Sequence, residues 1–495
     1  MTIVRTQAGL VQSLEQYGIA AFLGVPYAAP ITPERRFIAP EPVAPWTGLR
    51  QAGALSSVCP QIPTYGPVGT AAASALQTGT DFLTVNVRTP SVEGSAPVLV
   101  WLHGGGYAVG SANEPVLQSG AFATSGVVEV TVNYRLGVLG FLQLNDGTPA
   151  HRGLLDIIAA LEWVRDNIAS FGGDPERVTL AGRSAGGFAV ATLMAMPAAK
   201  GLFSKAMPQS GASIAVLSPE TAAKVTRRYL AELDATEAQL SELPIERLLY
   251  AQKHICDVSY NDHDVERDGS VTMTGVPLQP MIDGSSLPEH PDLAAANGRT
   301  APVPMMIGCT TAEYLTHATA QPEMDFALAA KLLHPRVQPL GLTGDEIIRR
   351  YREILPDHSA RGIWRAVGGD LVFQNPTTHF AAAHADHQPV YKYLYGEIEA
   401  DELGAPHGAE VGEVWYRKGM DMSGLPERQV VHNQQRARAV HQLWVSFITQ
   451  DKPLLPSGEG WPIYGQNRPD VLCIRRGEMT ISPDPFAERL MCWTQ

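Results

Sequence analysis

The stretch Gly182-Arg-Ser-Ala-Gly186 joins two segments whose patterns differ. Before it, Val178-Thr-Leu-Ala181 is a short apolar run typical of a buried strand, and after it Phe188-Ala-Val-Ala-Thr-Leu-Met194 is compatible with a helix. The stretch itself matches the pattern G-x-S-x-G, in which a strand turns sharply into a helix and presents a serine at the carboxyl edge of a sheet. The sequence therefore predicts an α/β fold with Ser184 as a candidate nucleophile.

Short apolar runs bounded by glycine and proline recur along the chain, and longer helical patterns lie between them. The runs span residues 98–102, 127–133, 178–181, 303–307 and 390–395. Such an alternation predicts a mostly parallel central sheet with helices on both faces. We expect one domain over residues 1–495, with helical and loop insertions over the active site and an inserted helical and loop region around 215–300.

The composition is that of a globular protein and excludes several classes of function. Of 495 residues, 45% are apolar and 18% are charged, and a net charge of −13 without a basic block argues against nucleic acid or an anionic membrane as a partner. No apolar run reaches the roughly 18 residues that cross a bilayer, and the first residues lack a signal-peptide pattern, so we expect a cytoplasmic protein. The chain has no phosphate-binding loop or dinucleotide fingerprint, so we expect no cofactor. The oligomeric state cannot be predicted from the sequence.

A second glycine-rich element, His103-Gly-Gly-Gly106, directly follows the predicted strand 98–102. Attack on an ester carbonyl builds negative charge on its oxygen, and backbone N–H groups that are fixed in advance stabilise this charge. Successive glycines let the backbone approach a substrate without a Cβ in the way. We therefore predict an oxyanion hole formed by the N–H groups of Gly105, Gly106 and Ala185, the residue after the candidate nucleophile.

Further motifs run the length of the chain. They are Phe22-Leu-Gly-Val-Pro-Tyr-Ala28, Arg36-Phe37, Asn133-Tyr-Arg-Leu-Gly-Val-Leu-Gly140, Gly153-Leu-Leu-Asp156, Phe171-Gly-Gly-Asp-Pro175, Gly201-Leu-Phe203, Gln209-Ser-Gly211 and Trp461-Pro462. Together with the two glycine-rich elements, they resemble the type B carboxylesterase family, which includes bacterial p-nitrobenzyl esterases and the cholinesterases. The resemblance covers nearly all of the chain and implies the α/β-hydrolase fold.

The resemblance also implies which carboxylate completes the site. Members of the family carry a glutamate in a turn after a strand, and this position matches Glu313, after the run 303–307. Two neighbours depart from the family pattern, because Ala312 replaces an acidic residue and Tyr314 replaces a glycine.

The family's histidine matches His407 in Gly404-Ala-Pro-His-Gly-Ala-Glu410. The resulting order of Ser184, Glu313 and His407 is the order that this fold uses. In such a triad the imidazole takes the hydroxyl proton and the carboxylate orients the imidazole. Ser210 resembles a residue that supports Glu313, and simple packing behind the sheet is an equally good explanation of it.

Arg183 is the most informative departure from the family. Members usually carry a glutamate before the serine, close to a second glutamate that matches Glu410 here, so an acidic pair has become Arg183 and Glu410. On one interpretation Arg183 forms an ion pair with Glu410 and supports the His407 loop. On the other, Arg183 binds a carboxylate of the substrate through its paired donors. Either interpretation makes cationic esters poor substrates.

The cysteines predict neither a zinc site nor a disulfide framework, since Cys59, Cys256, Cys309, Cys473 and Cys492 form no C-x-x-C pair. Relatives often join the Cys59 position to a cysteine at a position that Phe82 occupies here. We therefore expect residues 60–80 to form an untethered loop that leaves a mobile rim at the active-site entrance.

These observations predict a serine carboxylesterase that works through an acyl-enzyme and acts on a small-molecule ester, carboxylate-bearing or neutral rather than cationic. Two alternatives stay open. The same site could cleave amides or carbamates, or the chain could be a non-catalytic scaffold of this fold. The presence of Ser184, Glu313 and His407 together argues against the scaffold.

Overall fold

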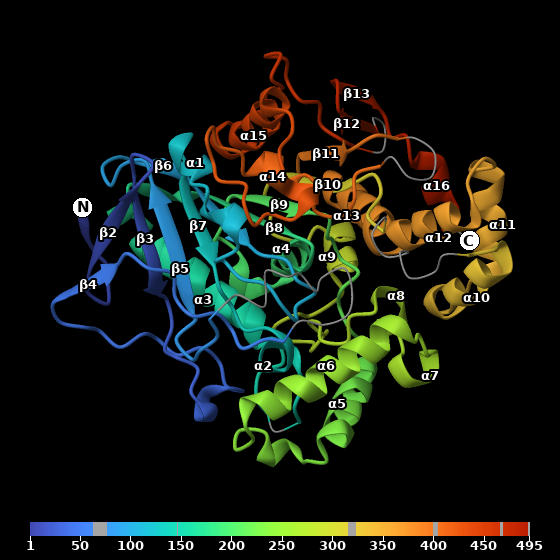
Figure 1. Cartoon of the computed structure of the whole chain (residues 1–495), viewed down its shortest axis with the longest axis horizontal. Helices are drawn as coiled ribbons and strands as arrows, with labels where there is room; N and C mark the ends of the chain where they lie inside the picture. The colour runs from blue at the N-terminus through green and yellow to red at the C-terminus, as the bar shows by residue number, and fades with distance from the viewer. Residues whose placement is uncertain (63–76, 146, 315–322, 399–403, 466–468, 494–495) are drawn as a thin grey trace.

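The computed structural model describes residues 1–495 apart from 63–76, 146, 315–322, 399–403, 466–468 and 494–495. Its framework is a 13-stranded sheet in the order β1-β2-β3-β5-β7-β6-β8-β9-β10-β11-β12-β13, with β4 beside β2 (Figure 1). The strands are β1 Ile3–Arg5, β2 Leu10–Gln16, β3 Ile19–Pro26, β4 Leu49–Ala52, β5 Thr84–Thr89, β6 Ala96–Leu102, β7 Val128–Val132, β8 Gly173–Arg183, β9 Lys205–Gln209, β10 Met305–Thr310, β11 Val390–Tyr395, β12 Asp470–Ile474 and β13 Met479–Pro483.

The centre of the sheet is parallel and its margins are antiparallel. Strands β7, β6, β8, β9, β10, β11 and β12 pair in parallel, whereas β1, β2, β3 and β5 at one margin and β13 at the other pair antiparallel. The predicted α/β fold with a mostly parallel sheet is therefore confirmed. The five apolar runs lie in β6, β7, β8, β10 and β11. The marginal strands escaped prediction because strands such as β2 alternate buried and partly exposed residues and form no continuous apolar run.

Helices cover both faces of the sheet, as predicted. They span α1 Ala121–Thr124, α2 Gly137–Phe141, α3 Arg152–Asn167, α4 Ala185–Ala195, α5 Pro219–Leu233, α6 Ile245–Asn261, α7 Val265–Asp268, α8 Val271–Thr274, α9 Pro291–Ala296, α10 Phe326–Val337, α11 Gly344–Ile354, α12 Ala360–Gly369, α13 Asn375–Ala385, α14 Val411–Val414, α15 Gln434–Thr449 and α16 Ala487–Met491.

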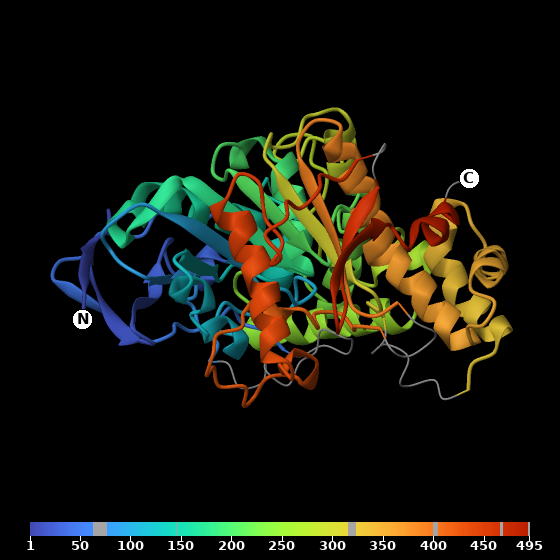
Figure 2. The same cartoon turned by 90° about the horizontal axis from the view of Figure 1, so that it is seen from above.

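The central strands send alternate side chains into two separate cores. In β6, Val98, Val100 and Leu102 belong to a core shared with α3 and α4. Leu99 and Trp101 belong to a second core shared with α15, which lies along one side of the sheet (Figure 2). Because side chains of a strand point alternately to opposite faces, both faces of β6 are buried.

Two groups of helices lie outside these layers. Helices α5 to α8 occupy residues 219–274, within the predicted insertion around 215–300, whereas α9 packs against α4 and α13 in a layer that covers the sheet (Figure 1). Helices α10, α11 and α12 form a second group with a small core of its own, which contains Leu333, Ile347, Tyr351 and Ile363. The sequence analysis did not predict this second group, because no motif marks it.

The cysteines are all free and buried, which agrees with the absence of a predicted disulfide framework. Most of the predicted untethered loop, residues 63–76, lies outside the described residues. Among the helices that the structure describes, none is long and apolar enough to cross a membrane.

A fully buried ion pair links the chain after β7 to α3. Both carboxylate oxygens of Asp156 accept hydrogen bonds from the Arg135 guanidinium, at 2.7 and 2.8 Å, and one also accepts from the Arg135 backbone N–H at 3.0 Å. The same guanidinium donates to the carbonyl of Ile38 at 2.6 Å. The Arg135 guanidinium therefore joins its own segment to α3 and to the chain around Ile38.

We expect Asp156→Asn to lower the free energy of unfolding by about 3–5 kcal/mol, because it leaves a buried guanidinium without its counter-charge. The matched control is Asp166→Asn, which removes an exposed pair with Arg165 and should change stability by less than about 1 kcal/mol. Urea unfolding of both variants measures the difference. Equal losses would contradict the assignment.

Candidate active site

Ser184 lies at a strained turn between β8 and α4. Its φ of 58° and ψ of −124° are sparsely populated for a non-glycine residue. The turn is held by a 2.9 Å hydrogen bond from the Ser184 N–H to the Gln209 carbonyl. It is also packed too tightly for side chains at its glycines: a Cβ on Gly182 would lie 2.5 Å from the Gly186 carbonyl oxygen, and one on Gly186 would lie 2.2 Å from that of Leu102.

Glu313 and His407 come from loops that are joined to each other. The Ala312 N–H donates to the Ala405 carbonyl at 3.0 Å, and the Ala405 N–H donates to Thr311 Oγ1 at 3.0 Å. These bonds bring the two side chains together, with His407 Nδ1 2.5 Å from Glu313 Oε2. The contact fixes which ring nitrogen faces the carboxylate and leaves Nε2 for another partner.

The carboxylate oxygen of Glu313 that does not face His407 also accepts hydrogen bonds. Oε1 accepts a 2.7 Å hydrogen bond from Ser210 Oγ and a 2.8 Å bond from the Thr310 N–H. Ser210 has a φ of 44° and donates its own N–H to the Gly308 carbonyl at 2.8 Å. Glu313 is therefore held from both sides, and Ser210 contacts it directly.

The imidazole of His407 shares one pocket with Ser184. It is nine-tenths buried, and its ring lies 4.8 Å from that of Phe373. Burial lowers the pKa of His407, the Glu313 carboxylate acts in the opposite direction, and the charges of Arg183 and Arg428 lower it further. The neutral imidazole, which can accept a proton, is therefore favoured at neutral pH.

The triple-glycine loop borders the same pocket. Gly105 has a φ of 125°, and a Cβ there would lie 1.8 Å from the Val109 carbonyl oxygen, so the loop requires glycine at this position. Within the described chain, the N–H groups of Gly105 and Gly106 donate no hydrogen bond. Ala185 begins α4, and the first N–H groups of a helix lack partners within it. These donors are available to a ligand oxygen.

His103 stabilises this loop from behind. Its Nδ1 lies 2.8 Å from the Gly104 carbonyl oxygen, and its ring stacks on Tyr134 at 4.5 Å. Burial lowers the pKa of His103 to about 4. It stays neutral and does not line the pocket of Ser184, so it is not a second base.

Arg183 and Glu410 do not form the ion pair that the sequence suggested. Both carboxylate oxygens of Glu410 are buried without a hydrogen-bond partner among the described residues. The Arg183 guanidinium instead lies between the loops of Gly104 and Gly408. A Cβ added to Gly408 would lie 2.7 Å from Nη1, and one added to Gly104 would lie 3.1 Å from Nη2. Burial raises the pKa of Glu410 to about 7, the Glu313 charge adds to the rise, and Arg183 opposes it. Protonation therefore takes the place of a counter-ion.

The whole chain matches one family of known proteins. The model of the "Carboxylesterase family" covers residues 1–493. The chain belongs to this carboxylesterase family. It is 33% identical to the para-nitrobenzyl esterase of Bacillus subtilis (strain 168), over 98% of this chain and 97% of that protein. It is 30% identical to the phenmedipham hydrolase of Pseudarthrobacter oxydans, over 95% and 94% of the two chains.

Solved structures agree with this assignment. A PNB esterase structure superposes with a TM-score of 0.85 at 30% identity, over 100% of this chain and 99% of the other. A Geobacillus stearothermophilus carboxylesterase superposes with a TM-score of 0.83 at 32% identity, over 100% of both chains. The predictions of a type B carboxylesterase and of a serine esterase that hydrolyses carboxylic esters are confirmed.

Sequence reasoning did not identify two residues of the esterase pocket and one neighbour of His407. Arg428 and Glu114 line the pocket beside Ser184, and Phe373 lies against His407 in a π-helical turn, Asp370–Gln374. No motif surrounds the two charged residues, and a chain with 37 lysines and arginines and 50 acidic residues offers many equal candidates. No signal in one sequence could have identified them.

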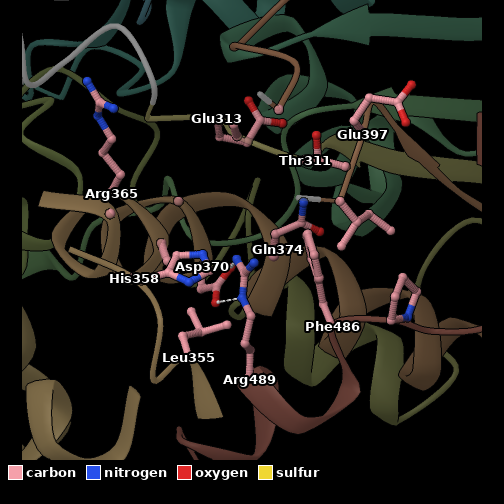
Figure 3. Close-up of a pocket in the computed structure, with 17 residues that line it drawn as sticks. Thr311, Glu313, Leu355, His358, Arg365, Asp370, Gln374, Glu397, Phe486 and Arg489 are labelled. Carbon is pink, nitrogen blue, oxygen red and sulfur yellow. Dashed lines mark hydrogen bonds and ion pairs between the residues drawn. The ribbon is translucent and has the colours of Figure 1, made fainter. Parts of the chain in front are cut away.

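A second cavity of the esterase, of about 290 Å³, also contacts Glu313 (Figure 3). Two of its charges form a pair, because the Arg489 Nε donates to Asp370 at 2.9 Å, and Asp370 also accepts from the Tyr351 hydroxyl at 2.6 Å. The described residues contain no cluster of three or more histidine, cysteine or acidic side chains that could hold a metal ion.

We expect Glu410→Gln to stabilise the esterase in a pH-dependent way. The pKa of Glu410 near 7 lies above its ordinary value of 4.5 because of burial, so between these pH values the folded state keeps a proton that the unfolded state releases. Wild-type stability therefore falls as pH rises through this range, by up to about 3 kcal/mol, and the variant lacks this loss.

Thermal unfolding at pH 5 and pH 8 measures the effect. The Tm of Glu410→Gln minus the Tm of wild type should be larger at pH 8 than at pH 5. The control Glu93→Gln changes an exposed glutamate, and its difference from wild type should be the same at both pH values. A Glu410→Gln difference that does not depend on pH would refute a buried, titrating carboxyl.

Proposed function

We propose that Ser184 is the nucleophile of this carboxylesterase, that His407 is its general base and acid, and that Glu313 orients His407. The observation that carries the proposal is that Ser184 and His407 line one pocket while His407 Nδ1 lies 2.5 Å from Glu313 Oε2. Such a set of groups activates an alcohol, which is a weak nucleophile until a base takes its proton.

In the first half of the reaction, Ser184 Oγ attacks the ester carbonyl carbon as His407 Nε2 takes the hydroxyl proton. The carbonyl oxygen becomes an oxyanion, and the N–H groups of Gly105, Gly106 and Ala185 stabilise it. The intermediate then expels the alcohol oxygen, which takes the proton from Nε2. An acyl-enzyme on Ser184 remains.

In the second half, water attacks the acyl-enzyme and transfers a proton to Nε2. The acid leaves as Ser184 recovers its proton from His407. Glu313 keeps its negative charge throughout and stabilises the imidazolium. Ser210 acts as a positioning residue, because its hydroxyl holds the carboxylate oxygen that does not face His407.

The preferred substrates are neutral or carboxylate-bearing esters rather than cationic ones. The Arg183 guanidinium lines the pocket next to Ser184 and repels a substrate cation. The similarity to a protein named para-nitrobenzyl esterase supports turnover of uncharged benzyl esters.

We expect Ser184→Ala to lower kcat for p-nitrophenyl acetate and butyrate by roughly 10⁴-fold or more, since loss of the nucleophile removes the acyl-enzyme route. The control Ser204→Ala removes a hydroxyl that bonds the Val178 carbonyl outside the pocket and should keep activity. A fluorophosphonate should label wild type and Ser204→Ala stoichiometrically and leave Ser184→Ala unlabelled. Labelling of Ser184→Ala would place the nucleophile elsewhere.

The acid limb of kcat/KM should report the titration of His407. Protonated imidazole cannot accept the Ser184 proton, so activity falls as pH decreases through the pKa of His407, which burial lowers. The midpoint should therefore lie below the value of about 6.5 for a free imidazole. Initial rates between pH 4.5 and 8 with an uncharged ester measure it, and a midpoint above 6.5 would contradict the assignment.

A further inference from the structure

We propose that Arg183 and Arg428 together form a carboxylate-binding subsite beside Ser184, so that the enzyme prefers esters that carry a carboxylate close to the scissile bond. This inference rests on the proposed function of Ser184 and names the substrate class of that site. It adds a second arginine, from a segment distant in sequence, as a residue that determines specificity.

The two guanidinium groups lie in the pocket of the proposed nucleophile. Arg183 and Arg428 line the pocket that Ser184, His407 and Gly105 also line. Arg183 also directly precedes Ser184 in the chain, and the charges of both arginines lower the pKa of the buried His407. A ligand bound between them would therefore lie within reach of the nucleophile.

The second step is that these guanidinium groups have no acceptor of their own. Neither Arg183 nor Arg428 makes a hydrogen bond or an ion pair with any residue that the structure describes, and Arg428 Nε is buried without a partner. Both arginines are only partly buried, whereas two fully buried arginines have carboxylate partners: Arg135 bonds Asp156 at 2.7 Å, and Arg88 lies 3.3 Å from Glu129. Two guanidinium groups that line a pocket without a protein acceptor leave their donors available to a ligand.

The positive charge of the two arginines is only partly balanced by acidic side chains around the pocket. Glu114 is the acidic residue in the wall of this pocket, and burial raises its pKa while Arg183 and Arg428 oppose the rise. Even when Glu114 is fully ionised, the wall of the pocket holds one carboxylate and two guanidinium groups. The buried Glu410 beside the pocket also attracts both arginines, but burial raises its pKa to about 7, so it carries a full negative charge only above that pH. Arg183 also lowers the pKa of Arg428, after the larger effect of burial, so the two cations repel each other. An added carboxylate would relieve this repulsion and could bond both planar forks.

The volume of the pocket limits which substrates the two arginines can bind. The pocket encloses about 50 Å³, which is room for roughly three or four water-sized groups. A carboxylate therefore fits only if a few bonds separate it from the ester carbonyl. Two substrate classes meet this condition: half-esters of short dicarboxylic acids carry the charge on the acyl side, and acyl esters of short hydroxy acids carry it on the alcohol side.

The experiment compares each acid with its uncharged amide of the same shape. The acyl-side pair is monomethyl glutarate and methyl glutaramate, and the alcohol-side pair is O-acetylglycolate and O-acetylglycolamide. We expect wild type to show a kcat/KM at least tenfold higher for the acid in one of the pairs, and that pair identifies the side. Acid release at constant pH 8 measures all four substrates.

The variants then test the arginines. Arg428→Gln should lower the acid-to-amide ratio of kcat/KM by roughly 10- to 100-fold, the effect of a charge-assisted hydrogen bond. Arg428→Lys should restore part of the ratio, because it keeps the charge and loses the fork. The matched control Lys418→Gln removes one exposed positive charge from outside the pocket and should leave the wild-type ratio. Fluorophosphonate labelling of Ser184 in each variant checks that the site is folded.

The outcomes separate this inference from the proposed function. The subsite is refuted if wild type shows no preference for the acid in either pair. It is also refuted if Arg428→Gln keeps the wild-type acid-to-amide ratio of kcat/KM. Neither result affects the proposed roles of Ser184, His407 and Glu313. If Arg428→Gln and Lys418→Gln lower the acid-to-amide ratio of kcat/KM equally, the preference comes from the overall electrostatic field of the protein, and the subsite is refuted. Turnover of the amide esters that survives Ser184→Ala would overturn the proposed function itself.

Discussion

The parallel pairing of β8, β9, β10 and β11 brings the carboxyl ends of these strands side by side. Arg183 pairs with Gln209, and Thr310 pairs with Tyr395 at the ends of the neighbouring strands. Ser184 follows the first of these strand ends, and Glu313 follows the third. The register of the sheet thus sets the distance between groups that lie far apart in the sequence, and the hydrogen bonds between the Glu313 and His407 loops complete the arrangement. A register shift of one strand would displace the reacting group that follows it relative to the others.

The charges of the molecule fall into two kinds. Away from the pocket, buried charges such as Arg135 and Asp156 meet in full hydrogen-bonded pairs. In and beside the pocket they do not: Glu410 has no hydrogen bond among the described residues, and the two arginines of the pocket lack acceptors. Buried polar groups without partners destabilise a folded protein, and here the Glu410 carboxyl and Arg428 Nε lie in or beside the pocket of Ser184. Proteins tolerate such features where they prepare a surface for another molecule.

Much of this architecture could be predicted from the sequence, because local patterns carry it. Central strands covered on both faces form apolar runs, and the turn at Ser184 requires glycines that a motif records. Glu313 and His407 could be located through resemblance to a family. The contents of the pocket could not be predicted in the same way. Arg428 and Glu114 reach it from segments without a motif, and their neighbours depend on the tertiary fold. One of the two interpretations of Arg183, an ion pair with Glu410, does not hold, because a family pattern does not fix the distance between two side chains and a buried carboxyl can be neutralised by a proton.

The buried cysteines have a chemical consequence for covalent inhibitors. Burial raises the pKa of Cys59 and of Cys256 to about 12 and also raises that of Cys309, in the strand that precedes Glu313. Thiolates are the reactive form of cysteine, so these side chains are poor competitors for an electrophile at neutral pH. An acylating or phosphonylating compound that enters the folded enzyme should therefore be consumed at the pocket rather than dispersed over thiols. All five cysteines are buried, so a cysteine-reactive dye should label unfolded molecules in preference to native ones.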